Sequence, residues 1–275
     1  MRSKKMRPAR SALVAMSLAC SPSATWAADW TDPTGGLFSD PLNWSPTVPG
    51  VGDLAVFNLG GAYTVDFDAS HVNQRLIVRS GSVTLNPGAF MYSLTTPSST
   101  SASVMVALTT GENATLTLAS GALNSMYATL GGPSASVGQA SVQSGASWST
   151  TFDLLVGDFG FGRFQVQAGG VATINDDLIV GQRPGPISRV DVLGAGAMLN
   201  VADQILLGSL GRAFMEVSGG AAVDTDVLYI GTFGASSGTV SIDGSKTTVH
   251  VEDLLPVGNE AMGTMLVSGG PQVTP

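Results

Sequence analysis

Apolar and polar residues recur at nearly even intervals along the second half of the chain. An aspartate, a short apolar run and a glycine appear as "DLLVG" (153–157), "DLIVG" (177–181), "DQILLG" (203–208), "DVLYIG" (226–231) and "DLLPVG" (253–258). A valine-like anchor before a small-residue turn recurs at nearly constant spacing, at Leu118, Val142, Val166, Val192, Val217, Ile242 and Val267. Such a regular period, longer than a strand or a helical turn, indicates a repeat architecture.

The residues before each anchor alternate in polarity. Two positions earlier stand Leu116, Ala140, Phe164, Val190, Met215, Val240 and Met265. Between the two apolar positions, six of seven residues are polar: Thr117, Ser141, Gln165, Asp191, Glu216 and Ser241, with Leu266 as the exception. This alternation predicts a strand with one buried face and one solvent-exposed face. The glycine-rich turn that follows predicts a sharp corner, so each unit reads as strand, corner, strand, corner, with a third short strand.

A unit of about 25 residues cannot bury its apolar side chains alone, but stacked units can. We therefore predict an all-β fold, a right-handed parallel β-helix with one unit per coil and about 4.8 Å between coils. A β-propeller is the alternative, although its blades need about 40 residues. We expect residues 112–275 to form the regular solenoid and residues 29–111 to form an N-terminal cap with irregular first coils, including a Ser/Thr-rich loop at 93–104.

The segment 1–28 has the three-part order of a secretory signal peptide. "MRSKKMRPAR" is basic, "SALVAMSLAC" is apolar, and "SPSATWAADW" offers small residues for cleavage after Ala27 or Ala28. A lipidated Cys20 is the alternative, but Ser17 stands where such a motif has a leucine-like residue. Cys20 is the only cysteine, so the processed chain would have no disulfide and would depend on packing and backbone pairing. No later stretch is apolar enough for a transmembrane helix.

Removal of the leader makes the chain strongly acidic. All 20 acidic residues but only 12 − 5 = 7 basic residues follow it, so the net charge becomes 7 − 20 = −13. Such a charge argues against nucleic acid and anionic lipid headgroups as partners. It favours solubility outside the cell, or cation binding.

The aspartates of the opening motif would stack at one corner, as the ladder Asp153, Asp177, Asp203, Asp226 and Asp253. We expect each to accept a hydrogen bond from a backbone N–H two residues further on. A file of calcium ions is the alternative, because stacked carboxylates about 5 Å apart repel one another unless they are screened or bound to metal. The calcium nonapeptide pattern is not met, so we predict no metal site.

Other candidate residues also have structural interpretations. Trp30, Phe38, Trp44 and Phe57 are predicted to cap the exposed end of the solenoid, with a sugar-stacking platform as the alternative. We expect His71 in a solvated loop, His250 facing outward on a strand, and "GDFGFG" (157–162) as a corner. Asp176 and Asp177 beside Asp203 could serve a polysaccharide-active β-helix enzyme, but the ladder recurs in coils without such neighbours. The sequence therefore predicts no catalytic or cofactor-binding residue.

The units resemble the repeat shared by autotransporter (type V secretion) passengers and PEP-CTERM-associated proteins. The resemblance is carried by "MEVSGGAAVDTDVLYIGTFGASSGTVSIDG" (215–244) and its neighbours, and by "DWTDPTGGLFSDPLNWSPTVPGVGDLAVFN" (29–58), and covers most of residues 29–275. It implies a secreted or surface-displayed β-solenoid, outer-membrane-associated or periplasmic, with a structural or adhesive role and no defined activity. We expect a cell-surface or polysaccharide partner.

Full family members typically continue into a C-terminal membrane barrel or a sorting helix. This sequence stops within a unit, at "VSGGPQVTP". We therefore expect either a truncated reading frame or another route of export. The strand edge of an open last coil would favour end-to-end association with a second chain.

Overall fold

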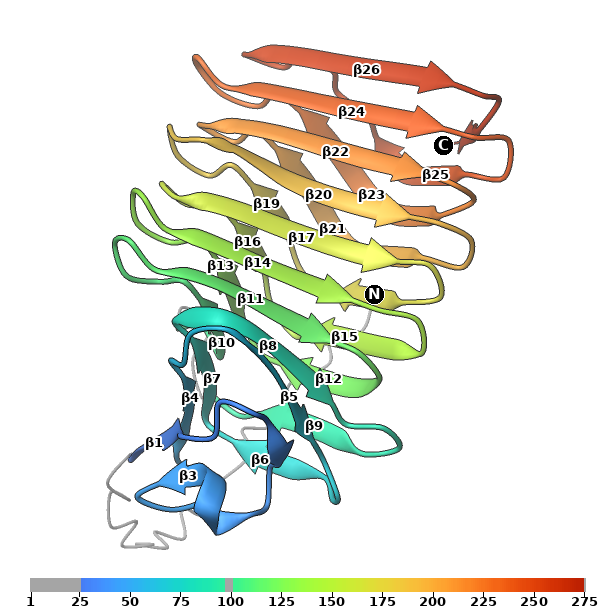
Figure 1. Ribbon diagram of the computed structural model, residues 1–275. Helices are drawn as coiled ribbons and strands as arrows, with labels where there is room; N and C mark the ends of the chain where they lie inside the picture. Colours follow the sequence, from blue (N-terminus) through green and yellow to red (C-terminus); the bar gives the residue numbers. More distant parts are fainter. Residues whose placement is uncertain (1–25, 97–100, 275) are drawn as a thin grey trace, which may run out of the picture.

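The strands of this chain stack into a parallel β-solenoid of about 10 turns of about 25 residues, as predicted (Figure 1). The computed structural model describes residues 26–96 and 101–274. A 10-stranded sheet forms one wall: β2 (Gly36–Leu37), β5 (Ala62–Asp66), β8 (Ser80–Asn86), β11 (Asn113–Leu118), β14 (Val137–Val142), β17 (Phe161–Gln167), β20 (Ile187–Leu193), β22 (Arg212–Ser218), β24 (Ser237–Asp243) and β26 (Met262–Ser268).

A 17-stranded sheet forms the rest of each coil, and we call it the second wall. After the first-wall strand, most coils contribute two short strands to it: β6 (His71–Asn73), β7 (Arg75–Val78), β9 (Met91–Leu94), β10 (Val104–Val106), β12 (Gly121–Ser125), β13 (Ala128–Leu130), β15 (Ala146–Thr150), β16 (Leu154–Val156), β18 (Val171–Ile174) and β19 (Leu178–Val180). In the later coils the two strands merge: β21 (Met198–Leu207), β23 (Ala222–Ile230) and β25 (Thr248–Leu254), followed by β27 (Gln272–Thr274).

The predicted anchor residues form one interior column. Each pairs in register with the anchor of the next coil, from Leu118 with Val142 to Ile242 with Val267. All are buried except Val267, which is 54% exposed on the last strand of this wall. The predicted register is therefore confirmed for the first wall from β11 to β26.

The same columns continue below the first recognised repeat. Leu85 of β8 pairs with Leu118, and Val83 pairs with Leu116. The interval from Leu85 to Leu118 is longer than the repeat period because the connection after β9 is long. The inserted loop breaks the sequence period, so the repeat pattern does not reveal this coil, although it packs like the regular ones.

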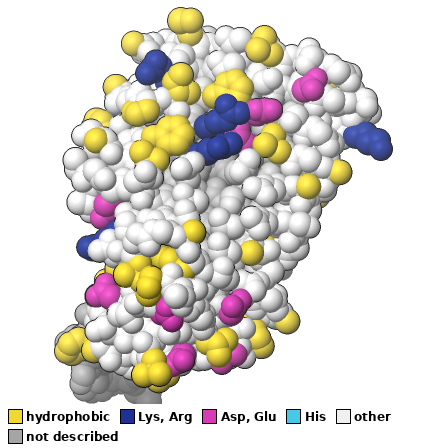
Figure 2. All heavy atoms as spheres, viewed as in Figure 1, with side chains coloured by type: hydrophobic (Ala, Val, Ile, Leu, Met, Phe, Trp, Pro, Cys, Tyr) yellow, Lys and Arg dark blue, Asp and Glu magenta, His cyan; other side chains and the backbone are white. Residues whose placement is uncertain are grey.

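The outward side of the first wall is polar, as expected, with one correction at Asp191. This carboxylate is 0% exposed because two arginines cover it: Arg163 Nη2 lies 2.7 Å from Oδ2, and Arg189 Nε contacts Oδ1. Arg189 Nη2 also lies 2.6 Å from Glu216 Oε2. Figure 2 shows basic and acidic side chains side by side on this wall. The buried carboxylate is tolerated here because both of its oxygens are paired with guanidinium groups, which offset the loss of hydration.

The aromatic residues near the N-terminus form the predicted cap. Trp30 and Trp44 pack edge to face with ring centroids 5.1 Å apart, and both are buried with Phe38 and Phe57. The two indole N–H groups donate to the carbonyls of Asp32 and Phe38, respectively, at 2.6 Å. Because the rings are buried, the sugar-stacking alternative is wrong.

Short elements complete the N-terminal end. They are β1 (Ala27–Trp30), β3 (Trp44–Ser45), β4 (Leu54–Phe57) and a 3-10 turn, η1 (Pro41–Asn43), which begins where the Asp40 carboxylate accepts from Leu42 N at 2.9 Å. Strand β1 includes the predicted cleavage position, whereas residues 1–25, which include Cys20, lie outside the described residues.

His71 is not in a solvated loop. It lies in β6, and its ring centroid is 4.4 Å from that of Phe38. Burial lowers the pKa of His71, and the carboxylate of Asp68 opposes this effect. Within the described residues, no helix is long and apolar enough to cross a membrane.

Candidate functional site: an acidic corner and a polar face

The aspartate ladder lies where the second strand of each coil leads into the third. Asp153 and Asp177 directly precede β16 and β19. In the merged strands the same place is a bulge, in which Ala202 and Asp203 of β21 lie opposite the single residue Asp226 of β23. The ladder residues of these coils therefore share one corner.

Three carboxylates converge at the lower part of this corner. Asp153, Asp176 and Asp177 each offer an oxygen, and these oxygens lie within 4.8 Å of one another. All three side chains are half-buried. Asp176 was not part of the repeat, because it precedes the ladder position in this coil. The sequence placed it beside Asp177, and only the fold places both beside Asp153.

The ladder carboxylates bond to the next coil rather than to their own turn. Asp177 N donates to Asp153 Oδ1 at 3.3 Å, and Gln204 N donates to Asp177 Oδ1 at 3.2 Å. The expected bond from an N–H two residues further on is therefore wrong for Asp153 and Asp177. The physical reason is that the third strand starts at once, so its own N–H groups bond to neighbouring strands: Leu154 N donates to Asp177 O at 2.9 Å.

Burial raises the pKa of Asp177 to about 6, and the charges of Asp153 and Asp203 add to this effect. Burial also raises the pKa of Asp153, although the hydrogen bond from Asp177 N opposes the rise. The corner therefore binds protons more readily than an ordinary surface carboxylate. Carboxylate oxygens are ligands that Ca²⁺ accepts, but Oδ1 of Asp153 and Oδ1 of Asp177 each accept a backbone hydrogen bond already.

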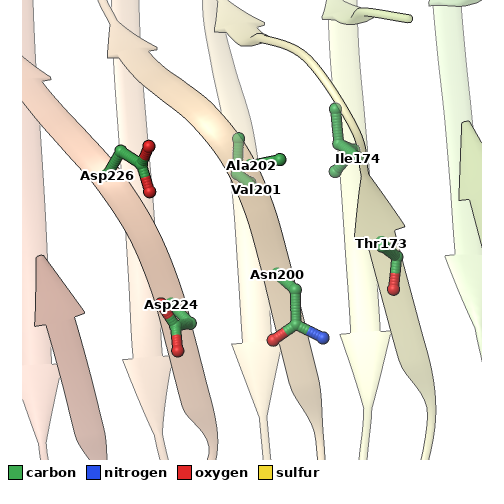
Figure 3. Close-up of a pocket in the computed structure, with 7 residues that line it drawn as sticks. All are labelled: Thr173, Ile174, Asn200, Val201, Ala202, Asp224 and Asp226. Carbon is green, nitrogen blue, oxygen red and sulfur yellow. The ribbon is translucent and has the colours of Figure 1, made fainter. Parts of the chain in front are cut away.

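A polar column runs beside the acidic corner on the outer side of the second wall. Figure 3 shows Thr173, Asn200 and Asp224 in a row on β18, β21 and β23, which the strand pairing confirms. The whole column is Ser93, Asn124, Ser149, Thr173, Asn200, Asp224, His250 and Thr274. His250 faces outward as predicted, and its Nδ1 lies 3.1 Å from Thr274 Oγ1.

A shallow groove of about 210 Å³ joins the polar column to the corner. It is lined by Thr173, Asn200 and Asp224 together with Ile174, Val201, Ala202 and Asp226. The groove lies at the bulge of β21 against β23, which interrupts the flat sheet surface. Sequence reasoning missed the polar column, since its residues vary between hydroxyl, amide, carboxylate and imidazole. The only sequence feature that these residues share is their equivalent position within the repeat.

The chain matches no protein-family model, no curated protein and no solved structure at a significant level. Its function must therefore be argued from its own residues.

Proposed function

We propose that this protein is an exported passenger-type β-solenoid with a structural or adhesive role, whose polar column binds polysaccharide at a cell surface. The observation that carries the proposal is the polar column itself. It presents a hydrogen-bonding side chain in each of eight strands, on a rigid wall. Successive groups are about 4.8 Å apart, so an extended polymer can be contacted along its length.

The chemistry of the column favours a polyhydroxylated ligand. Most of its members are neutral donors or acceptors, of the kind that pair with sugar hydroxyls. Asp224 adds a carboxylate and His250 an imidazole only toward the upper end. Many weak contacts repeated along a polymer give avidity without a deep pocket. The shallow groove beside Asn200 suits this mode of binding.

The adhesive part can be tested by binding to immobilised polysaccharides. The variant Ser149→Ala/Thr173→Ala/Asn200→Ala should bind at least about tenfold more weakly, since each lost hydrogen bond contributes about 1 kcal/mol. The matched control removes three outward polar side chains from the first wall, Thr117→Ala/Ser141→Ala/Gln165→Ala, and should bind normally. Equal loss in both variants, or no binding by the unaltered protein, would contradict the proposal.

The export part rests on the leader-like segment 1–28 and needs a separate experiment. Residues 1–275 expressed in a bacterium with an outer membrane should appear outside the cytoplasm, with an N-terminus at Ala28 or Asp29 by mass spectrometry. A version lacking residues 2–27 should stay in the cytoplasm. Cytoplasmic retention of the full chain, or an integral membrane protein that resists carbonate extraction, would overturn this part.

The convergence of Asp153, Asp176 and Asp177 favours one further candidate, a cation site. We expect no specific calcium binding, because the calcium nonapeptide pattern is not met and Asp153 and Asp177 already serve as hydrogen-bond acceptors for the backbone of the next coil. Isothermal titration checks this. Micromolar affinity that disappears in Asp153→Asn/Asp177→Asn would establish a calcium site instead. Release of reducing ends from a bound polysaccharide would favour the enzyme alternative based on Asp176, Asp177 and Asp203.

A further inference from the structure

One edge of the solenoid is built from loops that stack directly on one another. Each loop leads from a third strand into the next strand of the first wall (Figure 1, left). Arg183 N donates to Asp158 O at 3.1 Å, Leu210 N to Gln182 O at 3.2 Å, and Phe233 N to Ser209 O at 3.1 Å. Equivalent loop positions in successive coils therefore form columns, as the strands do.

The tips of these loops are apolar and exposed. Phe159 is 40% exposed, Leu210 51% and Phe233 45%, and Ile187, the first residue of β20, is 50% exposed. We call these four residues the apolar edge. A single exposed hydrophobic side chain needs no explanation, but a series on stacked loops favours contact with something apolar. These four come from four successive coils.

Cationic side chains lie among the apolar ones. The Arg183 guanidinium is 4.8 Å from the centre of the Phe159 ring, and its Nε is 3.2 Å from Asp158 Oδ1. Arg212 pairs in register with Ile187 and donates to Gly185 O at 3.3 Å. Within the described residues, no carboxylate oxygen lies within 4.0 Å of the Arg212 guanidinium. Figure 2 shows hydrophobic and basic side chains together along this edge.

The charge of the edge is opposite to that of the molecule. Residues 26–275 hold 7 basic and 20 acidic residues, 7 − 20 = −13. The segments that carry the apolar edge (157–161, 181–187, 208–212 and 231–237) hold two arginines, Arg183 and Arg212, and one carboxylate, Asp158, so their net charge is 2 − 1 = +1. These arginines lie far apart in the sequence, and stacking of the coils gathers them.

We propose that the apolar edge docks on a lipid bilayer that carries anionic headgroups. Apolar tips would enter the boundary between headgroups and acyl chains, while Arg183 and Arg212 contact the phosphates. The net charge of −13 opposes binding to anionic headgroups over most of the surface, and the local charge of this edge has the opposite sign. A second copy of the chain fits less well, because it would bring arginines against arginines. The proposal is independent of the polysaccharide-binding column, which lies on the other wall.

The test is co-sedimentation with vesicles, using protein purified after export. Vesicles of equal parts phosphatidylcholine and phosphatidylglycerol should bind the protein, and pure phosphatidylcholine should bind it about tenfold to thirtyfold more weakly, as expected for two arginines at the surface. The variant Phe159→Ser/Leu210→Ser/Phe233→Ser should lose binding by at least about tenfold. Any retained leader would be shared by all variants and would not alter their differences.

Two controls keep the result specific to the edge. Leu42→Ser/Val51→Ser removes hydrophobic side chains of 85% and 64% exposure from the opposite end of the chain and should bind like the unaltered protein. Circular dichroism must show the same strand signal and melting temperature for each variant. The positions are exposed, so the variants are expected to fold.

A charge variant and a reporter complete the design. Arg183→Gln/Arg212→Gln should remove the preference for anionic vesicles, whereas Arg79→Gln/Lys246→Gln should keep it. Phe233→Trp should show a blue-shifted emission on anionic vesicles. Absence of binding, equal binding by the serine variant, or loss in the control variants would overturn the proposal. A concentration-dependent dimer that the serine variant abolishes would assign the edge to a second copy instead, and would also overturn it.

Discussion

Replacement of Asp177 by Asn tests whether the charged acidic corner destabilises the folded state. Burial and the neighbouring carboxylates raise the pKa of Asp177 to about 6, against an ordinary value of 3.8. At about 1.4 kcal/mol per pH unit, the difference corresponds to about 3 kcal/mol of destabilisation of the charged form. The side chain is partly exposed, so solvent screening reduces the expected effect to about 1 kcal/mol.

The sign follows from the direction of the pKa change. A carboxyl group with a raised pKa in the folded state favours folding when it is protonated. The penalty is therefore fully present above about pH 6 and disappears as the pH falls from about 6 toward 4. The unaltered protein should become about 1 kcal/mol more stable over this range, apart from the contributions of other groups. Asp177→Asn should be about 1 kcal/mol more stable at pH 7.5 and should lack this part of the pH dependence.

Asparagine suits the test because its Oδ1 can still accept the hydrogen bond from Gln204 N, 3.2 Å away in the unaltered protein. Urea unfolding followed by circular dichroism at several pH values measures the difference, with Asp224→Asn, on the exposed polar column, as the matched control. A variant less stable than the unaltered protein at pH 7.5 would refute the reasoning. If the stability of the unaltered protein rose with added calcium, a bound cation would explain that result.

The remaining predictions concern the stacking of the coils. Val217→Asp should destabilise by more than about 4 kcal/mol in urea melts, because it places an unpaired charge in the interior column. Glu216→Ser should cost about 1 kcal/mol or less, through the lost ion pair with Arg189, and equal effects of the two changes would show that the register is wrong. Gly231→Ala should cost more than about 1 kcal/mol, because φ is 74° and the added Cβ would lie 2.3 Å from a carbonyl oxygen of the next coil. Gly234→Ala has φ of 61° and open space, so a thermal melt should show a smaller loss, and the reverse order would contradict the stacked loop geometry.

Most of the fold was predictable because a stacked repeat makes each long-range contact a periodic one. The anchor spacing predicted the pairing of Val192 with Val217 and of Val217 with Ile242, and both pairs are in register. The prediction lost accuracy where the period broke. Leu85 packs under Leu118 as in a regular coil, yet a longer connection concealed it.

The site was less predictable, because its properties depend on which side chains face one another across coils. The ladder position of Asp177 followed from the period, but its bond to Gln204 N did not. Asp191 was predicted to be exposed to solvent, like its neighbours in the column. It is buried because the side chains of Arg163 and Arg189 cover it. These two arginines pair in register on β17 and β20, and Arg189 stands two residues before Asp191.

The sequence by itself determined the architecture: polarity with period two within a strand and a period of about 25 along the chain leaves parallel stacking as the way to bury every apolar column. It also indicated which residues cap the end, but the burial of Trp30 and Trp44, which excluded a sugar-stacking platform, came from the structure. The tertiary structure alone decided which groups meet. Three carboxylates converge at one corner, and apolar and cationic loop tips gather on one edge, because coils about 4.8 Å apart bring together side chains that lie a full repeat apart in the chain.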